Sequence, residues 1–240
     1  MIAYSIFPYD ARIRRESETL AKQGHKVSFL VLSENGRPAR YKANGVNVIE
    51  IGTRKYRGKR VFSYIFSYIR FLVLAFLACT RLFLKGQVDV IHVHNMPDFL
   101  VFAAIVPRFF RKKLILDIHD SMPETYSGKF GRLSRALYNL LCLEERFCSR
   151  FAHKVVCVND VQREVLLKRG IPREKITVLL NVPDPMIFKF ISRRGHPSDA
   201  AKLGFNLVYH GTIDRMLGID LAIETVSRLK EKFRGFDFTS

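Results

Sequence analysis

The chain has 240 residues, 48% of them hydrophobic, and 40 lysines and arginines against 22 acidic residues give it a net charge of +18. This length suits one large domain or one domain with part of another, and the hydrophobic share excludes a largely disordered chain. The positive charge indicates a polyanionic neighbour: nucleic acid, an anionic membrane surface or a phosphorylated small molecule.

Short β-branched runs alternate along the chain with helical patterns. Two helices are expected at residues 133–151 and 159–170, where apolar residues recur at i, i+3, i+4 and i+7. The runs DVIHV and KLILDI are continuously apolar, which is typical of parallel strands covered on both faces. The pattern predicts an α/β fold, a Rossmann-like parallel sheet with helices on both faces. Strands are expected at residues 2–6, 26–32, 46–51, 89–94, 113–118, 154–158 and 175–180.

Polar residues follow three of these strands. His119 and Asp120 end the run KLILDI, His94 and Asn95 end DVIHV, and the loop FPYDARIRRE follows the first strand. Ligands of open parallel sheets bind outside the carboxyl ends of the strands, so these groups are expected to converge on one binding edge. The alternative for each histidine is a hydrogen-bonded residue at a strand end.

The loop after the first strand also predicts an anion site. Asp10 is a good N-cap, and Arg12, Arg14 and Arg15 follow in the first turns of the expected helix. A helix N-terminus favours anions, and arginine binds phosphates or carboxylates well. The alternative is a solvated basic face.

A metal site is not expected. His92 and His94 share one face of a strand and His119 could approach them, but the chain has no H-E-x-x-H helix and no Cys/His cluster. His92 is expected to point into the packed core. The four cysteines form no C-x-x-C pair, so they are expected to be reduced, buried thiols of a cytoplasmic protein. No secretory signal is recognised in the first ten residues.

Residues 54–85 form the most hydrophobic stretch. Arg70 and Arg81 bracket only ten apolar or neutral residues, too few for a membrane span, so a crossover helix packed on the sheet is expected. The segment TRKYRGKR before it has five basic residues among eight, which suits contact between the helix rim and anionic lipid headgroups. Nucleic acid is not expected as a partner, because no zinc-finger, RNP or KH signature is present.

Five segments in chain order resemble glycosyltransferase family 4: SIFPYDARIRRESETLAKQGHKVSFLVL, DVIHVHNMPDFL, LILDIHDSMPE, VVCVNDVQREVLLKRGIPREKITVLLNVPD and LVYHGTIDRMLGIDLAIETVSRL. The resemblance implies a GT-B architecture, in which two Rossmann-like domains face a cleft. The amino-terminal domain takes the acceptor and the carboxy-terminal domain binds a nucleotide-diphosphate sugar. It further implies a retaining mechanism without a metal or other cofactor.

The resemblance assigns site residues individually. His119 matches the histidine that approaches the donor sugar, with Asp120 fixing its loop. Asp10, Arg12, Arg15, His94 and Asn95 fall on the acceptor side. On the donor side, Gly211 and Gly218 match the glycines of the diphosphate loop, but Thr212 and Leu217 stand where many members have arginine and lysine. Arg215 lies between them and is expected to compensate.

The resemblance also predicts the domain organisation. Residues 1–190 are expected to form the acceptor-side domain, 191–204 a linker, and 205–240 the incomplete start of a second Rossmann-like, donor-binding domain with a helix at 217–233. The family's E-x(7)-E segment is not among these residues. The chain by itself is therefore expected to be inactive.

Two functions from different classes follow. The first is sugar transfer to a glycan or lipid-linked acceptor in cell-envelope polysaccharide synthesis, at the inner face of the cell membrane. The alternative is a non-catalytic, membrane-associated binding subunit, or inactive fragment, that docks a separate donor-binding chain.

Overall fold

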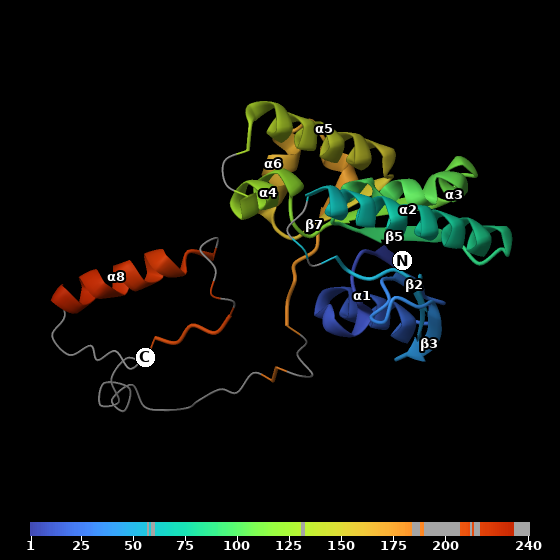
Figure 1. The fold of residues 1–240 in the computed structure, drawn as a ribbon, viewed down its shortest axis with the longest axis horizontal. Helices are drawn as coiled ribbons and strands as arrows, with labels where there is room; N and C mark the ends of the chain where they lie inside the picture. The colour runs from blue at the N-terminus through green and yellow to red at the C-terminus, as the bar shows by residue number, and fades with distance from the viewer. Residues whose placement is uncertain are drawn as a thin grey trace. The chain divides into compact units, whose positions relative to one another are not determined.

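The computed structural model describes residues 1–56, 58, 61–130, 133–183, 188–189, 207–211, 213 and 217–232 (Figure 1). They belong to two compact units, Met1–Asn181 and Val182–Ser240. The predicted linker, residues 191–204, lies outside the described residues, and so do Thr212 and Arg215. The predicted division of the chain at residue 190 therefore stays a prediction.

One eight-stranded sheet organises the first unit, with the strand order β3-β4-β2-β1-β5-β6-β7-β8. Neighbouring strands pair in parallel except β3 and β4, which are antiparallel. All seven predicted strands are present, although β1 is shorter than expected. The strands are β1 (Ile2–Ala3), β2 (Ser28–Val31), β3 (Ala39–Ala43), β4 (Val46–Glu50), β5 (Val90–His94), β6 (Lys113–Ile118), β7 (Lys154–Cys157) and β8 (Ile176–Val178).

The edge strand β3 makes the sheet mixed rather than wholly parallel, which corrects the prediction. It pairs with β4 through a tight turn at Asn44 and Gly45, both of which have positive φ (47° and 85°). The sequence ARYKA is largely exposed and carries two basic residues, so it lacks the apolar run that identified the other strands. The Asn-Gly pair was the signal for this hairpin, because both residues tolerate the left-handed region.

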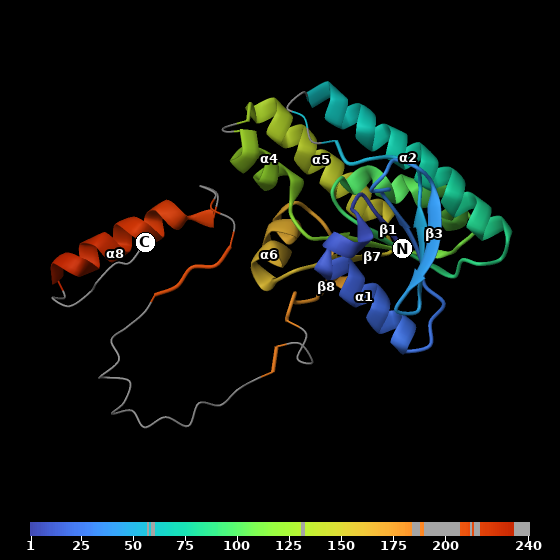
Figure 2. The same ribbon diagram turned by 60° about the horizontal axis from the view of Figure 1, so that its bottom comes forward.

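Helices connect the strands and cover both faces of the sheet. Figure 2 shows α2 and α5 together on one face and α1 on the other. Asp10 caps α1 as expected, by accepting from the Ile13 amide, and Ser134 and Asn159 cap α5 and α6. The helices of this unit are α1 (Ala11–Lys22), α2 (Val61–Leu84), α3 (Ile105–Phe109), α4 (Met122–Phe130), α5 (Arg135–Phe151) and α6 (Asp160–Lys168), with 3-10 turns at Phe7–Tyr9, Asp98–Ala104 and Arg173–Lys175.

The alternation of side chains along β2 divides the core into two layers. Phe29 packs in a cluster with Ile13 of α1, whereas Leu30 packs in a cluster with Phe71 of α2. Successive strand residues point to opposite faces, so both faces must be covered by apolar helices. Each such buried side chain contributes about 1.5–3 kcal/mol.

Helix α2 packs on the core along one face only. Phe71, Ala75 and Cys79 are buried, which confirms the expected packing of a crossover helix on the sheet. Its segment Phe62–Leu84 is nevertheless long and apolar enough to cross a membrane. The most apolar 18-residue stretch of this segment has a mean hydropathy of 1.8, and only 17% of that stretch is buried. The exposed apolar residues of the helix form its outer face: Phe62, Ile65, Phe66, Ile69, Val73, Leu77 and Leu84.

The second unit contains α8 (Ile219–Lys232), which matches the helix expected at 217–233. Three of its apolar side chains, Leu221, Ile223 and Leu229, are exposed. The four cysteines are free; Cys79, Cys148 and Cys157 are buried as expected, whereas Cys142 is only half-buried.

Candidate functional site

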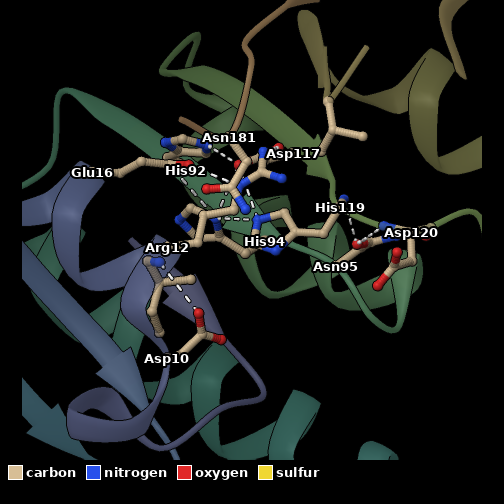
Figure 3. Close-up of polar contacts among 12 residues, drawn as sticks. Asp10, Arg12, Glu16, His92, His94, Asn95, Asp117, His119, Asp120 and Asn181 are labelled. Carbon is tan, nitrogen blue, oxygen red and sulfur yellow. Dashed lines mark hydrogen bonds and ion pairs between the residues drawn. The ribbon is translucent and has the colours of Figure 1, made fainter. Parts of the chain in front are cut away.

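The carboxyl ends of β5 and β6 meet α1 at one edge of the sheet (Figure 3). His94 of β5 lies opposite Asp117 of β6 in the parallel register, and His119 follows two residues later. Asp10 caps the N-terminus of α1, and this helix brings Arg12 and Glu16 from its first turns to the same edge. The predicted convergence of three polar segments is therefore confirmed.

Asp117 is the centre of the site, and the sequence reasoning missed it. Its carboxylate is fully buried, and its Oδ2 lies 3.1 Å from His94 Nδ1 and 3.1 Å from His119 Nε2. Its Oδ1 accepts a hydrogen bond from Arg12 Nη2 at 2.9 Å. An ionisable residue inside the apolar run KLILDI was the available signal, because a buried carboxylate requires partners.

The charges of this cluster are set by burial and by its hydrogen bonds. Burial by itself would raise the pKa of Asp117, but the neighbouring imidazoles of His119, His92 and His94 outweigh it and hold this pKa well below its usual range. Burial, reinforced by the neighbouring His92, lowers the pKa of His94 well below its ordinary value. Asp117 is therefore ionised and His94 neutral near pH 7.

Arg12 joins two carboxylates of the cluster. Its Nε lies 3.0 Å from Glu16 Oε1 and its Nη2 2.9 Å from Asp117 Oδ1, and its side chain is 10% exposed. Burial, together with the charge of Asp117, raises the pKa of Glu16. The guanidinium of Arg12 is thus held inside the cluster, where it positions Glu16 and Asp117.

His92 belongs to this cluster rather than to the apolar core, which corrects the expectation for its side chain. Its ring stacks on that of His94 with centroids 4.3 Å apart, and its Nε2 lies 3.6 Å from Asp117 Oδ2. The sequence also predicted no metal site. The structure nevertheless places ligand atoms of Glu16, His94, Asp117 and His119 within 4.8 Å of one another.

Asn95 fixes the loop that carries His119. Its Oδ1 accepts from the His119 amide at 2.8 Å, and its Nδ2 donates to the Asp120 carbonyl at 2.6 Å and to Asp98 Oδ1 at 2.9 Å. Asp120 is exposed and takes part through its backbone. The Asn95 side chain therefore holds this loop. The resemblance had implied that Asp120 does so, but Asp120 contributes its backbone and not its carboxylate.

The remaining acceptor-side residues surround this cluster. Asp10 Oδ2 accepts from Ser5 Oγ at 2.9 Å, so its carboxylate serves the N-cap and the preceding loop. Arg15 donates to Asn181 Oδ1 at the end of the first unit. On the donor side, Gly211 is exposed and Gly218 has a φ of 70°.

A second polar network, also missed from sequence, supports the loop after β6. Arg169 Nη1 lies 2.6 Å from Ser121 Oγ and 2.6 Å from Glu145 Oε1, and Glu145 is fully buried. Burial raises the pKa of Glu144 to about 7 and raises that of Asp98 well above its ordinary value. These contacts tie α5 and α6 to the residues directly after Asp120.

The mostly parallel α/β sheet with polar groups at its carboxyl edge is a Rossmann-like domain of the GT-B type. This chain is similar to the sucrose-phosphate synthase of Thermosynechococcus elongatus, with a TM-score of 0.66 and 16% identity. The match covers 95% of this chain and 59% of that chain. Anabaena HepE, in a structure in complex with UDP and glucose, matches with a TM-score of 0.49 and 14% identity, over 84% of this chain and 48% of that chain. No match was found among the curated proteins.

The family is shown by the sequence match. The profile of Glycosyltransferase Family 4 matches residues 11–185, and this chain belongs to that family. The match includes β2 to β8 and α1 to α6, and therefore every residue of the cluster around Asp117. The chain spans 59% of the sucrose-phosphate synthase chain that it matches.

Proposed function

We propose that this chain is the acceptor-side part of a retaining glycosyltransferase that moves a sugar from a nucleotide-diphosphate sugar to a glycan or lipid-linked acceptor in cell-envelope polysaccharide synthesis. The observation that carries the proposal is the placement of His119. In a chain of Family 4, this histidine stands at the carboxyl edge of the sheet, 17% exposed and held by Asp117 and Asn95.

His119 can orient the donor sugar from this position. Its Nε2 faces Asp117 Oδ2, which leaves Nδ1 for a sugar hydroxyl next to the anomeric carbon. In a retaining transfer, the nucleotide diphosphate leaves and the acceptor hydroxyl attacks the same face of the sugar. Catalysis then depends on position and on stabilisation of the leaving diphosphate, in this proposal by Arg215 and the Gly211–Gly218 loop. The nucleotide sugar enters as a substrate, and this chemistry needs no further cofactor.

A lipid-linked acceptor fits the surface beside α2. A hollow of about 550 Å³ combines cationic Arg54, Lys55 and Arg70 with apolar Phe62 and Phe66. Such a lining suits a lipid phosphate next to a hydrocarbon chain. Together with the exposed apolar face of α2, it supports a cytoplasmic enzyme bound peripherally to the inner face of the membrane.

The second candidate is a non-catalytic, membrane-associated subunit that docks a separate donor-binding chain. The exposed side chains of Leu221, Ile223 and Leu229 on α8 favour it, because an apolar helix face of this kind is normally covered by a sheet. The two candidates differ in whether His119 takes part in chemistry.

The test is sugar transfer by this chain, alone and joined to a complete donor-binding half. Radiolabelled nucleotide sugars would be supplied with membrane lipids or glycans as acceptors. We expect transfer by the joined enzyme and none by the chain alone. A joined enzyme that binds the nucleotide sugar but transfers nothing to any acceptor would favour the non-catalytic subunit.

A further inference from the structure

The apolar outer surface of the first unit extends beyond α2 to α3 and α5. Five large side chains on these two further helices are at least 60% exposed: Phe109, Phe110, Leu140, Leu143 and Phe147. The three on α5 recur at i, i+3 and i+7, so they form one outward stripe. A surface helix of a soluble protein normally carries polar residues on that side.

Aromatic rings join the three helices into one surface. Phe83 of α2 lies against Phe110 of α3, with ring centroids 5.4 Å apart. Phe102, in the 3-10 turn that contacts both α2 and α5, lies against Phe147 of α5 at 5.9 Å. Figure 2 shows α2 and α5 together on one face of the sheet. Exposed apolar surface that continues across three helices indicates an interaction site.

The charge around this surface has one sign. Residues 51–88 and 99–116, which supply α2, α3 and the segments beside them, contain twelve lysines and arginines and no aspartate or glutamate. The two acidic residues of α5, Glu144 and Glu145, are half-buried and buried, and neither belongs to the outward stripe. A second copy of this chain would bring the same positive charge against the surface and be repelled, whereas an anionic bilayer is complementary to it.

The packing of α2 requires this helix to lie along a bilayer rather than across it. Phe71, Ala75 and Cys79 are buried in the core cluster that includes Leu30 of β2. A spanning α2 would uncover that face of the sheet. An interfacial helix instead keeps one side on the protein and places the other about 5–10 Å into the headgroup boundary.

We propose that α2, α3 and α5 form one membrane-binding surface, which inserts its apolar side chains flat into the headgroup boundary of an anionic bilayer without spanning it. This inference rests on the membrane partner in the proposed function and adds the contact surface and the orientation. The hydroxyls of Tyr4, directly after β1, and Ser67 of α2 share a hydrogen bond at 2.5 Å, so the first turns of α2 lie at the carboxyl edge. The edge that carries His119 would then lie beside the bilayer, where a lipid-linked acceptor is held.

The chain contains no tryptophan, so a single introduced tryptophan reports on one position. The test uses the full 240-residue chain with vesicles of phosphatidylglycerol and phosphatidylcholine that are brominated on their acyl chains. In Phe109→Trp and Phe147→Trp, binding should shift the emission to shorter wavelength, and the bromines should quench about half of it or more, since both rings enter the headgroup boundary. Leu20→Trp on α1, which covers the opposite face of the sheet, should show neither change.

The depth of α2 in the bilayer distinguishes a flat helix from a span. Val73 lies in the middle of α2 and is 49% exposed. In Val73→Trp, bromines close to the headgroup should quench the emission more strongly than bromines at the ends of the acyl chains. The reverse order would place Val73 at the centre of the bilayer and overturn the flat orientation.

Quenching in Val73→Trp but in neither Phe109→Trp nor Phe147→Trp would overturn the shared surface, because α2 alone would then bind. Failure of all these variants to bind the vesicles at low salt would overturn it too. Sedimentation without vesicles should give a monomer, and a dimer whose introduced tryptophans are already shielded would assign the surface to a second copy. Circular dichroism verifies that each variant is folded. No nucleotide sugar is used, so transfer by the joined enzyme is decided separately.

Discussion

The carboxyl edge of the sheet and the outer face of α2 reverse the usual distribution of side chains. At the edge, the carboxylates of Asp117 and Glu145 are fully buried. On α2, Phe62 and Phe66 are 87% and 69% exposed. Burying charge and exposing large apolar side chains both cost free energy, so each arrangement marks a surface used for more than stability.

The two regions differ in how that cost is met. At the edge, Arg12 and three histidines surround Asp117, so the buried charge is compensated within the fold. The outer face of α2 lies opposite the residues that pack on the core, and a membrane surface is the partner that we propose for it. Loss of a single side chain at the edge should therefore change stability or turnover. Binding by α2 should instead change with the salt and the lipid around it.

The largest expected effect is on stability, from Asp117→Ala. The change leaves the buried guanidinium of Arg12 without one of its two carboxylates, and breaking a buried ion pair costs about 3–5 kcal/mol. Urea unfolding measures it. Asp89→Ala is the matched control, because Asp89 pairs with Lys112 but is 92% exposed, and stability should barely change. Equal losses in the two variants would show that burial of Asp117 carries no special weight.

The next effect is on turnover. In an enzyme that includes the donor-binding half, His119→Ala should lower turnover about 100-fold or more, because a positioned polar group is lost near the reacting carbon. Thermal unfolding should show that the fold survives. Steady-state kinetics with the right donor provides the measurement, and turnover within a factor of about two of the parent excludes this role for His119.

The pH dependence of stability tests the second buried network. Glu144 has a pKa of about 7 in the fold against 4.5 ordinarily, so between these pH values the folded state binds a proton that the unfolded chain does not. The free energy of unfolding should therefore fall, by about 3 kcal/mol in all, as pH rises from 4.5 through 7, and it should level off above about pH 8. Asp98, whose pKa is also raised, adds to the same fall.

Glu144→Gln provides the control for that prediction. It removes the titrating carboxylate, so most of the fall between pH 4.5 and 7 should disappear. Urea unfolding at pH 5 and at pH 8 compares the two proteins. An unchanged pH profile in the variant would assign the fall to other groups.

The smallest expected effect is on membrane binding. Anionic liposomes should bind the chain, and binding should weaken as salt rises through about 0.5 M. A variant with glutamine at five basic positions before α2 should bind at least about tenfold more weakly; its substitutions are at Arg54, Lys55, Arg57, Lys59 and Arg60. Vesicle sedimentation measures this, with neutral vesicles for comparison.

A second variant controls for net charge alone. It loses the same number of exposed basic residues from the region of α1 and β3, at Lys22, Lys26, Arg37, Arg40 and Lys42. If both variants lose binding equally, attraction depends on the charge of the whole chain. If only the first does, the segment before α2 directs it.

The sequence by itself determined the layers of the fold and the edge where the site lies. Continuous apolar runs such as KLILDI predict strands covered on both faces, and parallel strands bring their carboxyl ends to one edge, so the sequence places His94 and His119 together. The exposed strand β3 was not predicted, because its apolar residues alternate with basic ones and form no continuous apolar run.

Only the tertiary structure decided the partners of the buried charges. Arg12 and Asp117 are 105 residues apart in sequence, but Arg12 Nη2 lies 2.9 Å from Asp117 Oδ1, a pairing that depends on how the fold places α1 relative to β6. Helical periodicity identifies α2, but which face packs on the core depends on the side chains that meet it, so the exposure of Phe62 and Phe66 also required the structure. Local patterns set the elements because backbone periodicity is local, whereas burial and ion pairing join residues that are distant in the chain.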